Sequence, residues 1–508
     1  MMKRLAIYFH YDPNGQVDTA CLFAVRAVQQ VAHTVIFVTN GSLTPTDRDR
    51  VQRTGAHLVE RENTGYDVGA YRAVLLDLGR DTLAEYDELL LLNYTLAGPV
   101  CPLGAMMQAM EARRDLDFWG LTRHYAMRSA RFRTAYGAVP EHIQSHFLAV
   151  RPKLFLSDAF WQYWRTMRLP QSYEQSVALH EARFTRWFAD LGFAWDTYVQ
   201  TDDLKHIFVN PIMACPQELL AQRGCPFFKR RSFFTPYGDE LRRTDGQAGH
   251  RLYDYLKTKT DYPVDDLVRS LLQTQPLTAL AQNLHWHLLL PPCCDGAAAH
   301  CLNLDAAGLQ GKTPLQPGRI YCLTLPENVA GVAGGDETAN WYWRAAQPDP
   351  AAICAAATLF AREPLLGLLG PALPLYPGCA AQRQGDWQKD LPALRRAMRE
   401  NGLRVPLEES EPLPLPTGGC LLLRAEAFGC LLPPLRAPVD VWLLPLLAQQ
   451  NGYASMTFET AEQCLARTEV LTCSQAQTRD VKSAAKALAR AVKRRWRAKH
   501  PTKKEVGD

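Results

Sequence analysis

The sequence lacks any apolar stretch long enough to cross a membrane, and it does not begin with a signal peptide. After Met1 to Arg4, the apolar run is short and ends at His10. A signal peptide needs an apolar region of about 7–15 residues followed by a cleavage site, and a spanning helix needs about 20 apolar residues. We therefore expect a cytoplasmic protein whose only membrane contact is peripheral, on the inner face of the plasma membrane.

Paired cysteines are also missing. The fourteen cysteines include no Cys-x-x-Cys pair and follow no regular spacing. The only cluster is Cys293, Cys294 and Cys301, whose spacing fits no common zinc site. This usage argues against a disulfide framework and predicts reduced thiols in a cytosolic protein.

Net positive charge is concentrated at the end of the chain. The formal net charge is +4, but residues 481–508 hold ten Lys or Arg and two acids, which leaves the first 480 residues mildly acidic. At helical spacing, one face of this segment carries Val481, Ala485, Leu488, Val492 and Trp496. A basic amphipathic helix with a Trp anchor suits an anionic membrane surface. The alternative is a tail that is simply solvated. We do not expect nucleic acid as a partner, because no base-reading module accompanies the positive charge.

The first part of the chain alternates between strand and helix patterns, as α/β folds do. The 508 residues are enough for two or three domains. From residue 3 to about 120, apolar runs alternate with segments of helical spacing, and the run 89–92 is typical of a central parallel strand. We expect strands over 5–9, 34–39, 56–59, 89–92, 117–122 and 146–150, and helices over 17–31, 45–54 and 68–78. The predicted fold is a doubly wound α/β domain.

The central feature of this domain is the loop before the helix predicted over 68–78. The sequence Asn63-Thr64-Gly65 is typical of a tight turn, because Asn and Gly tolerate a left-handed backbone. Asp67 follows in the first helical turn, where a carboxylate is favoured in any case. A simple helix cap is therefore an alternative to a binding role for Asp67.

Three further polar clusters follow predicted strands, and ligands of α/β sheets bind at the carboxyl ends of strands. The clusters are His10-Tyr11-Asp12, Asn40-Gly41 and Asn93-Tyr94-Thr95. We expect them to converge with the 63–67 loop on a nucleotide or sugar phosphate. Lys229, Arg230 and Arg231 stand between Phe pairs, which favours a phosphate clamp over a solvated run of charge. The aromatic residues of 152–210 are expected mainly in the core, with a few available to stack on sugars.

Several of these motifs resemble, in the same order, the rhamnan synthesis F proteins, which are bacterial glycosyltransferases of polysaccharide assembly with a GT-A-like fold. The matching stretches together cover about residues 3–235: His10-Tyr11-Asp12, 38–40, 61–71, 89–93, 118–122, 145–148, 181–185 and 226–231. The resemblance implies a glycosyltransferase, specifically a rhamnosyltransferase, that moves a sugar from a dTDP-linked donor to a growing cell-surface glycan or a lipid-linked glycan.

The resemblance also implies roles for particular residues. The nucleotide sugar is expected over His10, Tyr11, Asp12, Asn40, Asn63, Gly65, Asp67 and Asn93, and its diphosphate on Lys229, Arg230 and Arg231. Asp67 and Glu181 are the expected catalytic residues. Glu181, at the start of an aromatic-rich helix, is the candidate base; a structural Glu at a helix start is the alternative.

This chain departs from the family pattern at one position that is important for metal binding. The family's loop after the Leu-rich strand reads Asn-Asp-Ser or Asn-Asp-Thr, whereas this chain has Tyr94 in place of the acid. Mg²⁺ and Mn²⁺ prefer oxygen ligands, carboxylates above all. Asn93 and Thr95 remain as candidate metal ligands. Four consequences remain open. Metal binding could be weaker, Asp67 could replace the missing acid, the cations of 229–231 could neutralise the diphosphate instead, or activity could be lost.

The second half of the chain is richer in Ala, Pro, Gly and Cys. Residues 362–371 and 416–424 still resemble the family, but no second Asn-x-Gly-x-Asp loop is present. We predict four segments: a GT-A-like domain (1–243), connecting helices (244–290), a reduced, non-catalytic α/β transferase-like domain (291–478) and a basic tail (479–508). The alternative to an enzyme is a glycan- or nucleotide-binding scaffold on a decayed transferase fold.

Overall fold

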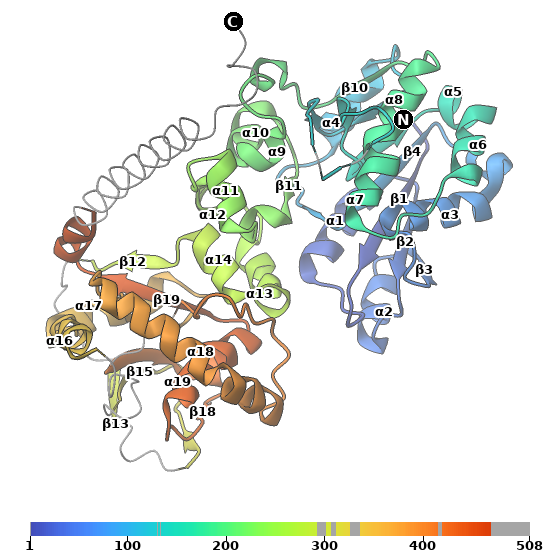
Figure 1. Ribbon diagram of the computed structural model, residues 1–508. Helices are drawn as coiled ribbons and strands as arrows, with labels where there is room; N and C mark the ends of the chain where they lie inside the picture. The colour runs from blue at the N-terminus through green and yellow to red at the C-terminus, as the bar shows by residue number, and fades with distance from the viewer. Residues whose placement is uncertain are drawn as a thin grey trace, which may run out of the picture. The chain divides into compact units, whose positions relative to one another are not determined.

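The computed structural model describes residues 2–129, 131–132, 134–291, 301–305, 311–325, 336–414 and 419–468. The chain divides into two compact units, Met1–His285 and Trp286–Asp508. Figure 1 colours the first unit from blue to green and the second from yellow to red. The two units are described separately below.

The first unit is built on a seven-stranded sheet in the order β10-β6-β9-β4-β1-β2-β3. Its strands are β1 (Arg4–Tyr11), β2 (Thr34–Asn40), β3 (His57–Arg61), β4 (Glu88–Asn93), β6 (Phe118–Gly120), β9 (Phe147–Val150) and β10 (Trp195–Thr197). The strands β3, β2, β1 and β4 are parallel neighbours. All strands predicted from the apolar runs are confirmed, and the fold is α/β.

The direction of β9 was not predicted. This strand runs antiparallel to both of its neighbours, β4 and β6. It follows a hairpin formed by β7 (Arg123–His124) and β8 (His142–Ile143). The reversal brings the chain from that hairpin back alongside β4, so residues just before β9 lie near the carboxyl end of β4, as the hydrogen bond from Asn93 N to His146 O at 3.2 Å shows.

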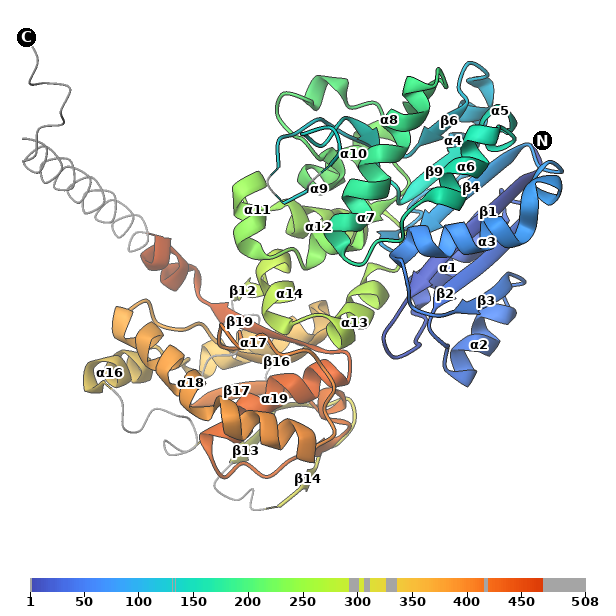
Figure 2. The ribbon, with the colours of Figure 1, turned by 45° about the vertical axis from the view of Figure 1, so that its right-hand side comes forward.

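Helices cover both faces of this sheet, as a doubly wound fold requires. The helix α3 (Tyr66–Leu83) buries Val68, Tyr71 and Leu75 against the face formed by Leu5, Ile7 and Phe9, and Figure 2 shows α3 lying along that face. On the opposite face, Tyr8 lies next to Cys21 of α1 (Thr19–Gln29). Alternate residues of β1 therefore contact different helix layers. α2 (Pro45–Gln52) and α4 (Gly104–Ala112) complete this part.

Most of the aromatic residues of 152–210 belong to the core. Phe155, Phe160, Trp164, Phe184 and Phe188 are fully or almost fully buried in the same cluster as the sheet. Their elements are α5 (Pro152–Phe155), α6 (Asp158–Thr166), α7 (Tyr173–Ser176), the π-helical turn Val177–Glu181 and α8 (Ala182–Asp190). The packing interpretation of these rings is confirmed.

The rest of the described first unit is helical apart from one short antiparallel pair of strands. β5 (Leu96–Ala97) pairs antiparallel with β11 (Phe228–Lys229). The other elements are the 3-10 turns Asp202–Leu204 and Arg230–Phe233, α9 (Pro211–Ala214), α10 (Pro216–Arg223), α11 (Tyr237–Arg243), α12 (Ala248–Lys259), α13 (Val264–Thr274) and α14 (Leu277–Leu284). The helices of 244–290 thus lie within the first unit.

The second unit has a six-stranded sheet in the order β12-β19-β16-β17-β15-β13. Its strands are β12 (His287–Leu289), β13 (Cys301–Asp305), β15 (Ile320–Thr324), β16 (Leu366–Pro371), β17 (Cys420–Arg424) and β19 (Ala454–Glu459), and β14 (Thr313–Pro314) pairs with β18 (Leu431–Leu432). The helices are α16 (Glu337–Ala345), α17 (Pro350–Arg362), α18 (Pro377–Glu400), the turn Ala425–Phe428 and α19 (Pro438–Gln450). Its own core gathers around Leu368, Leu421 and Leu444.

The predicted basic tail, residues 479–508, lies outside the described residues. Its expected contact with an anionic membrane surface therefore stays a prediction. Among the described helices, none combines the length and the apolar character needed to cross a membrane.

Candidate active site

The loop between β3 and α3 has an unusual backbone that places Asp67. Gly65 has φ of 73° and Tyr66, the next residue, has φ of 55°. A positive φ is rare for a residue with a side chain and is often found at functional sites. A Cβ on Gly65 would meet Leu169 Cδ2 at 2.9 Å, and one on Gly69 would meet Thr64 O at 2.6 Å. The backbone contact requires glycine at position 69, and the positive φ favours glycine at position 65.

Asn40 and Arg61 hold this loop from the neighbouring strands. Asn40 Nδ2 donates to Asn63 Oδ1 and to Tyr66 O, both at 3.3 Å. Arg61 Nη1 donates to Asn40 Oδ1 at 2.5 Å and to Thr64 O at 3.0 Å. Two of the predicted binding residues, Asn40 and Asn63, are therefore brought together, with Asn40 buried and Asn63 exposed.

A chain of hydrogen bonds runs from Asp67 to the end of β4. Asn93 Nδ2 donates to Asp67 Oδ2 at 2.9 Å. Val68 N and Ser176 Oγ donate to Asp67 Oδ1 at 3.0 and 3.4 Å. Thr95 Oγ1 donates to Asn93 Oδ1 at 2.5 Å. Burial raises the pKa of Asp67 above its ordinary value, and the hydrogen bond from Asn93 opposes that shift.

Lys229 extends this chain from β11. Its Nζ donates to Thr95 Oγ1 at 3.0 Å. Burial lowers the pKa of Lys229 to about 8, whereas the negative charges of Glu181 and Asp67 act in the opposite direction and Arg231 adds to the lowering. Two carboxylates and the Arg231 guanidinium therefore lie within electrostatic reach of Lys229. Within the described part of the chain, no hydrogen bond or ion pair involves the Arg231 guanidinium, so its donors remain available.

Arg230, a predicted diphosphate ligand, does not join this group. Its guanidinium forms an ion pair with Asp18, the residue that caps α1 by accepting from Cys21 N. Both side chains are largely buried, with 11% and 18% of their surface exposed. Burial raises the pKa of Asp18, but the charge of Arg230 and the hydrogen bonds from Arg230 and Cys21 together outweigh it, so the pKa lies below its ordinary value. The Arg230 donors are thus committed to the fold.

We expect Arg230→Met to destabilise the protein rather than to weaken diphosphate binding selectively. Removing one partner of a buried ion pair leaves an uncompensated charge, here on Asp18, and costs about 3–5 kcal/mol. Urea unfolding of the purified variant measures this loss. Adding Asp18→Asn should recover a large part of it. An unchanged unfolding midpoint together with weaker nucleotide binding would place Arg230 in the site after all.

Glu181 lies within electrostatic reach of Lys229. Ser145 Oγ donates to Glu181 Oε2 at 2.7 Å, and His142 Nε2 lies 3.4 Å from Oε1, forming an ion pair only when the ring is protonated. Burial raises the pKa of Glu181, but His142, Ser145 and Lys229 outweigh it, so the pKa falls well below its ordinary value. Glu181 ends a π-helical turn, Val177–Glu181, a feature often found at functional sites.

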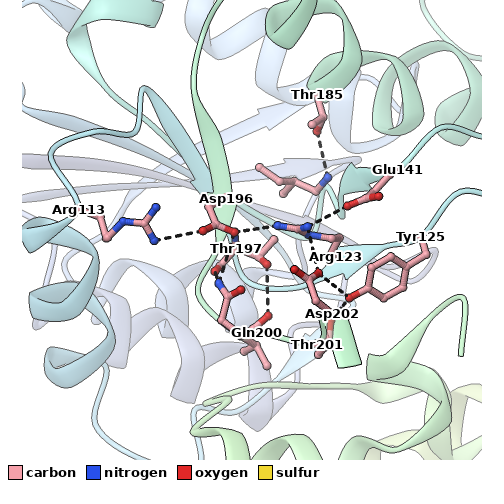
Figure 3. Close-up of polar contacts among 12 residues, drawn as sticks. Arg113, Arg123, Tyr125, Glu141, Thr185, Asp196, Thr197, Gln200, Thr201 and Asp202 are labelled. Atoms are coloured by element: carbon pink, nitrogen blue, oxygen red, sulfur yellow. Dashed lines mark hydrogen bonds and ion pairs between the residues drawn. The ribbon is translucent and has the colours of Figure 1, made fainter. Parts of the chain in front are cut away.

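The hairpin that carries His142 is anchored by a polar network (Figure 3). Arg123 of β7 pairs with Glu141, Asp196 and Asp202 at 2.9, 2.8 and 3.2 Å. Ile143 N donates to Thr185 Oγ1 of α8 at 3.0 Å, which joins the hairpin to the helix following Glu181. This anchoring fixes His142 and Ser145 against Glu181.

The remaining predicted residues support or border the site. His10 is buried, contacts Thr39 Oγ1 at 3.2 Å through Nδ1 and has its pKa lowered by burial to about 4, so it is neutral near pH 7. Asp12 accepts from Asn14 N and Gln16 N and so shapes the loop after β1. Tyr11 is half-buried. The Tyr94 ring lies 5.5 Å from the His10 ring.

The residues at the end of β4, including the expected metal ligands Asn93 and Thr95, are a poor fit for a divalent cation. Asn93 Oδ1 already accepts from Thr95 N and Oγ1, and Thr95 Oγ1 accepts from Lys229 Nζ. The oxygens that would bind Mg²⁺ or Mn²⁺ are therefore taken, and an ammonium stands beside them. Among the residues that the structure describes, no group of three or more His, Cys, Asp or Glu side chains is arranged to hold a metal ion.

The sequence analysis gave no role to three polar residues of the site. Ser176 contacts Asp67, whereas Ser145 and His142 contact Glu181. Ser145 lies in a stretch that matches the family and could have been considered on that ground. His142 and Ser176 carry no such signal.

Comparisons with known proteins give one family match and more distant likenesses. Residues 35–291, half of the chain, match the family model of rhamnan synthesis protein F. A curated protein of Sinorhizobium fredii, y4gN, is 24% identical over 209 residues, or 41% of this chain and 51% of its own length. The chain thus spans about half the length of this relative.

Solved structures give likenesses of low overall similarity. A glucosyl-3-phosphoglycerate synthase of Mycobacterium tuberculosis with phosphoglyceric acid has a TM-score of 0.23 and 15% identity, and the match covers 30% of this chain and 58% of that one. A cytidylyltransferase of Leptospira borgpetersenii has a TM-score of 0.23 and 10% identity, with 39% and 76% covered.

Proposed function

The chain belongs to the rhamnan synthesis protein F family, and from that premise we propose that its first unit is a glycosyltransferase. In this proposal it moves a sugar from a nucleotide-sugar donor to a glycan acceptor in polysaccharide assembly. The family name favours rhamnose as the sugar and dTDP-rhamnose as the donor. A lipid-linked or growing cell-surface glycan is the proposed acceptor.

One observation carries the proposal: the hydrogen-bonded chain from Asp67 through Asn93 and Thr95 to Lys229. It lies at the carboxyl ends of β1 and β4, where α/β sheets bind their ligands. A carboxylate accepts hydrogen bonds from the hydroxyl groups of a sugar or nucleoside, and cations bind phosphate oxygens. Both kinds of group are present here within reach of one another.

Glycosyl transfer requires a base for the acceptor and positive charge for the leaving group. The acceptor hydroxyl oxygen attacks the anomeric carbon of the donor, and the bond from that carbon to the phosphate oxygen breaks. The electron pair of that bond leaves with the nucleoside diphosphate. Lys229 and Arg231 are proposed to stabilise its charge, and Glu181 is proposed to receive the hydroxyl proton. The lowered pKa of Glu181 keeps its carboxylate ionised at neutral pH, although it also makes that carboxylate a weaker base.

A thermal-shift panel of nucleotides and nucleotide sugars tests this proposal, since a ligand that binds only the folded state raises the melting temperature. We expect dTDP and dTDP-rhamnose to stabilise the protein, and Asp77→Asn, which removes an exposed carboxylate from the same helix, to respond like the wild type. Stabilisation by a different nucleotide would change the assigned donor but leave the proposed glycosyltransferase activity in place. No shift with any nucleotide would favour the binding scaffold on a decayed transferase fold.

A further inference from the structure

Lys229 lies beside the β4 loop, against the hydroxyl of Thr95, which was an expected metal ligand. Its Nζ lies 3.0 Å from Thr95 Oγ1, the hydroxyl that bonds to Asn93. Its charge also acts on Asp67 and on Glu181, the two carboxylates of the site. A metal ion bound by Thr95 would meet this ammonium at close range, and like charges at such distances repel strongly in a partly buried site.

The backbone around Lys229 is fixed by close packing. Lys229 pairs with Leu96 in the β5–β11 ladder, and Arg230 N donates to Thr95 O at 3.1 Å. A Cβ on Gly98 would meet Pro226 O at 2.6 Å, so glycine is needed for this approach. The side chain of Arg230 is held on Asp18. Lys229 is therefore directed to Thr95 by a rigid frame rather than by a free loop.

From this geometry we propose that Lys229 supplies the positive charge for the leaving diphosphate, so that donor binding and transfer need no divalent metal. The inference rests on the proposed function and specifies its chemistry. During transfer, the bond between the anomeric carbon and the phosphate oxygen breaks and its electron pair goes to that oxygen. Lys229 keeps its proton and donates hydrogen bonds to the diphosphate, while the acceptor proton goes to Glu181. Arg231, beside Lys229, provides the second cation.

This arrangement also accounts for the charges in the site. Asp67 and Glu181 together would repel an anionic donor. Lys229 and Arg231 offset these two negative charges before the donor arrives. Charged hydrogen bonds to phosphate are about twice as strong as neutral ones, so the same two cations can then bind the diphosphate. No metal ligand has to be assembled for this step.

Calorimetric titration with dTDP and with UDP, in EDTA and in Mn²⁺, tests the inference. The wild type should bind one of these nucleotides with dissociation constants that agree within about twofold in the two buffers. Lys229→Met should weaken binding by about 10- to 100-fold, the loss expected for one charged hydrogen bond. Lys229→Arg should retain a large part of the affinity, and Lys259→Met, at an exposed position of α12, should match the wild type.

Two results would overturn the inference: wild-type binding that requires Mn²⁺, or a Lys229→Met variant that binds as the wild type does. If Lys229→Met does not fold, two other measurements test the inference: whether nucleotide binding by the wild type depends on Mn²⁺, and whether Lys229→Arg retains affinity. A wild type that binds no nucleotide in either buffer would instead contradict the proposed glycosyltransferase. As a further check, Tyr94→Asp combined with Lys229→Ala should make nucleotide binding depend on Mn²⁺, because it replaces the cation with a carboxylate ligand.

Discussion

Asp67→Asn should reduce sugar transfer by at least about 100-fold, the usual loss when one preorganised charged group is removed from an active site. The substitution keeps the shape of the side chain but removes the charge that acts on Lys229. It also places an amide opposite Asn93 Nδ2, which now donates to the carboxylate. Release of nucleoside diphosphate from the donor, with and without acceptor, measures the loss.

The fold should tolerate this substitution. Because burial raises the pKa of Asp67 in the folded protein, its ionisation costs stability as the pH rises through that pKa, and the neutral amide removes this cost. The new contact with Asn93 acts in the opposite direction. We expect a melting temperature within about 4 °C of the wild type. Full activity in Asp67→Asn, or equal loss in Asp77→Asn, would exclude Asp67 from the site.

The same pKa shift predicts the acid side of the pH profile. If transfer needs the ionised carboxylate, activity should fall on acidification at a pH above the ordinary value for an Asp side chain. The lowered pKa of Glu181 keeps that group ionised in the same range, so its protonation is not expected to set this limit.

Glu181→Gln should lower kcat by about 100- to 10,000-fold, the contribution typical of a general base. Gln retains an oxygen that can accept from Ser145 but cannot take up the acceptor proton. Affinity for the nucleoside diphosphate should change little, because the phosphate contacts are assigned to Lys229 and Arg231. Steady-state kinetics together with calorimetric titration separate the two effects.

A purely structural role for Glu181 gives a different result. In that case Glu181→Gln should lower the melting temperature, because the contacts with His142 and Ser145 are weakened, and kcat should fall by less than about tenfold. Glu174→Gln is the matched control, since Glu174 lies in the adjoining helix and pairs with Arg131 at the surface. It should leave kcat unchanged.

The architecture of the first sheet was predictable because buried parallel strands leave a strong signal in sequence. Leu89 to Leu92 form an uninterrupted apolar run, and they are β4. The turn at Asn63 to Gly65 likewise indicated the strand–loop–helix unit that holds Asp67. The antiparallel direction of β9 was not predictable, because an apolar run has no direction of its own and its pairing depends on the hairpin before it.

The composition of the site was only partly predictable, because its contacts join distant parts of the chain. Glu181 meets Ser145, 36 residues away, and Lys229 meets Thr95, 134 residues away. All three residues of the run Lys229-Arg230-Arg231 are cationic, and the sequence alone does not show which side chain faces the site. The two-residue strand β11 and the 3-10 turn after it direct Lys229 to Thr95 and Arg230 to Asp18.

A crystal structure of the protein with dTDP bound, prepared in EDTA, tests the account most directly. The account predicts a diphosphate in contact with Lys229 Nζ and Arg231, and a nucleoside near Asp67 at the carboxyl ends of β1 and β4. Density for dTDP at another place in the first unit, or in the second unit, would contradict the assignment of the site.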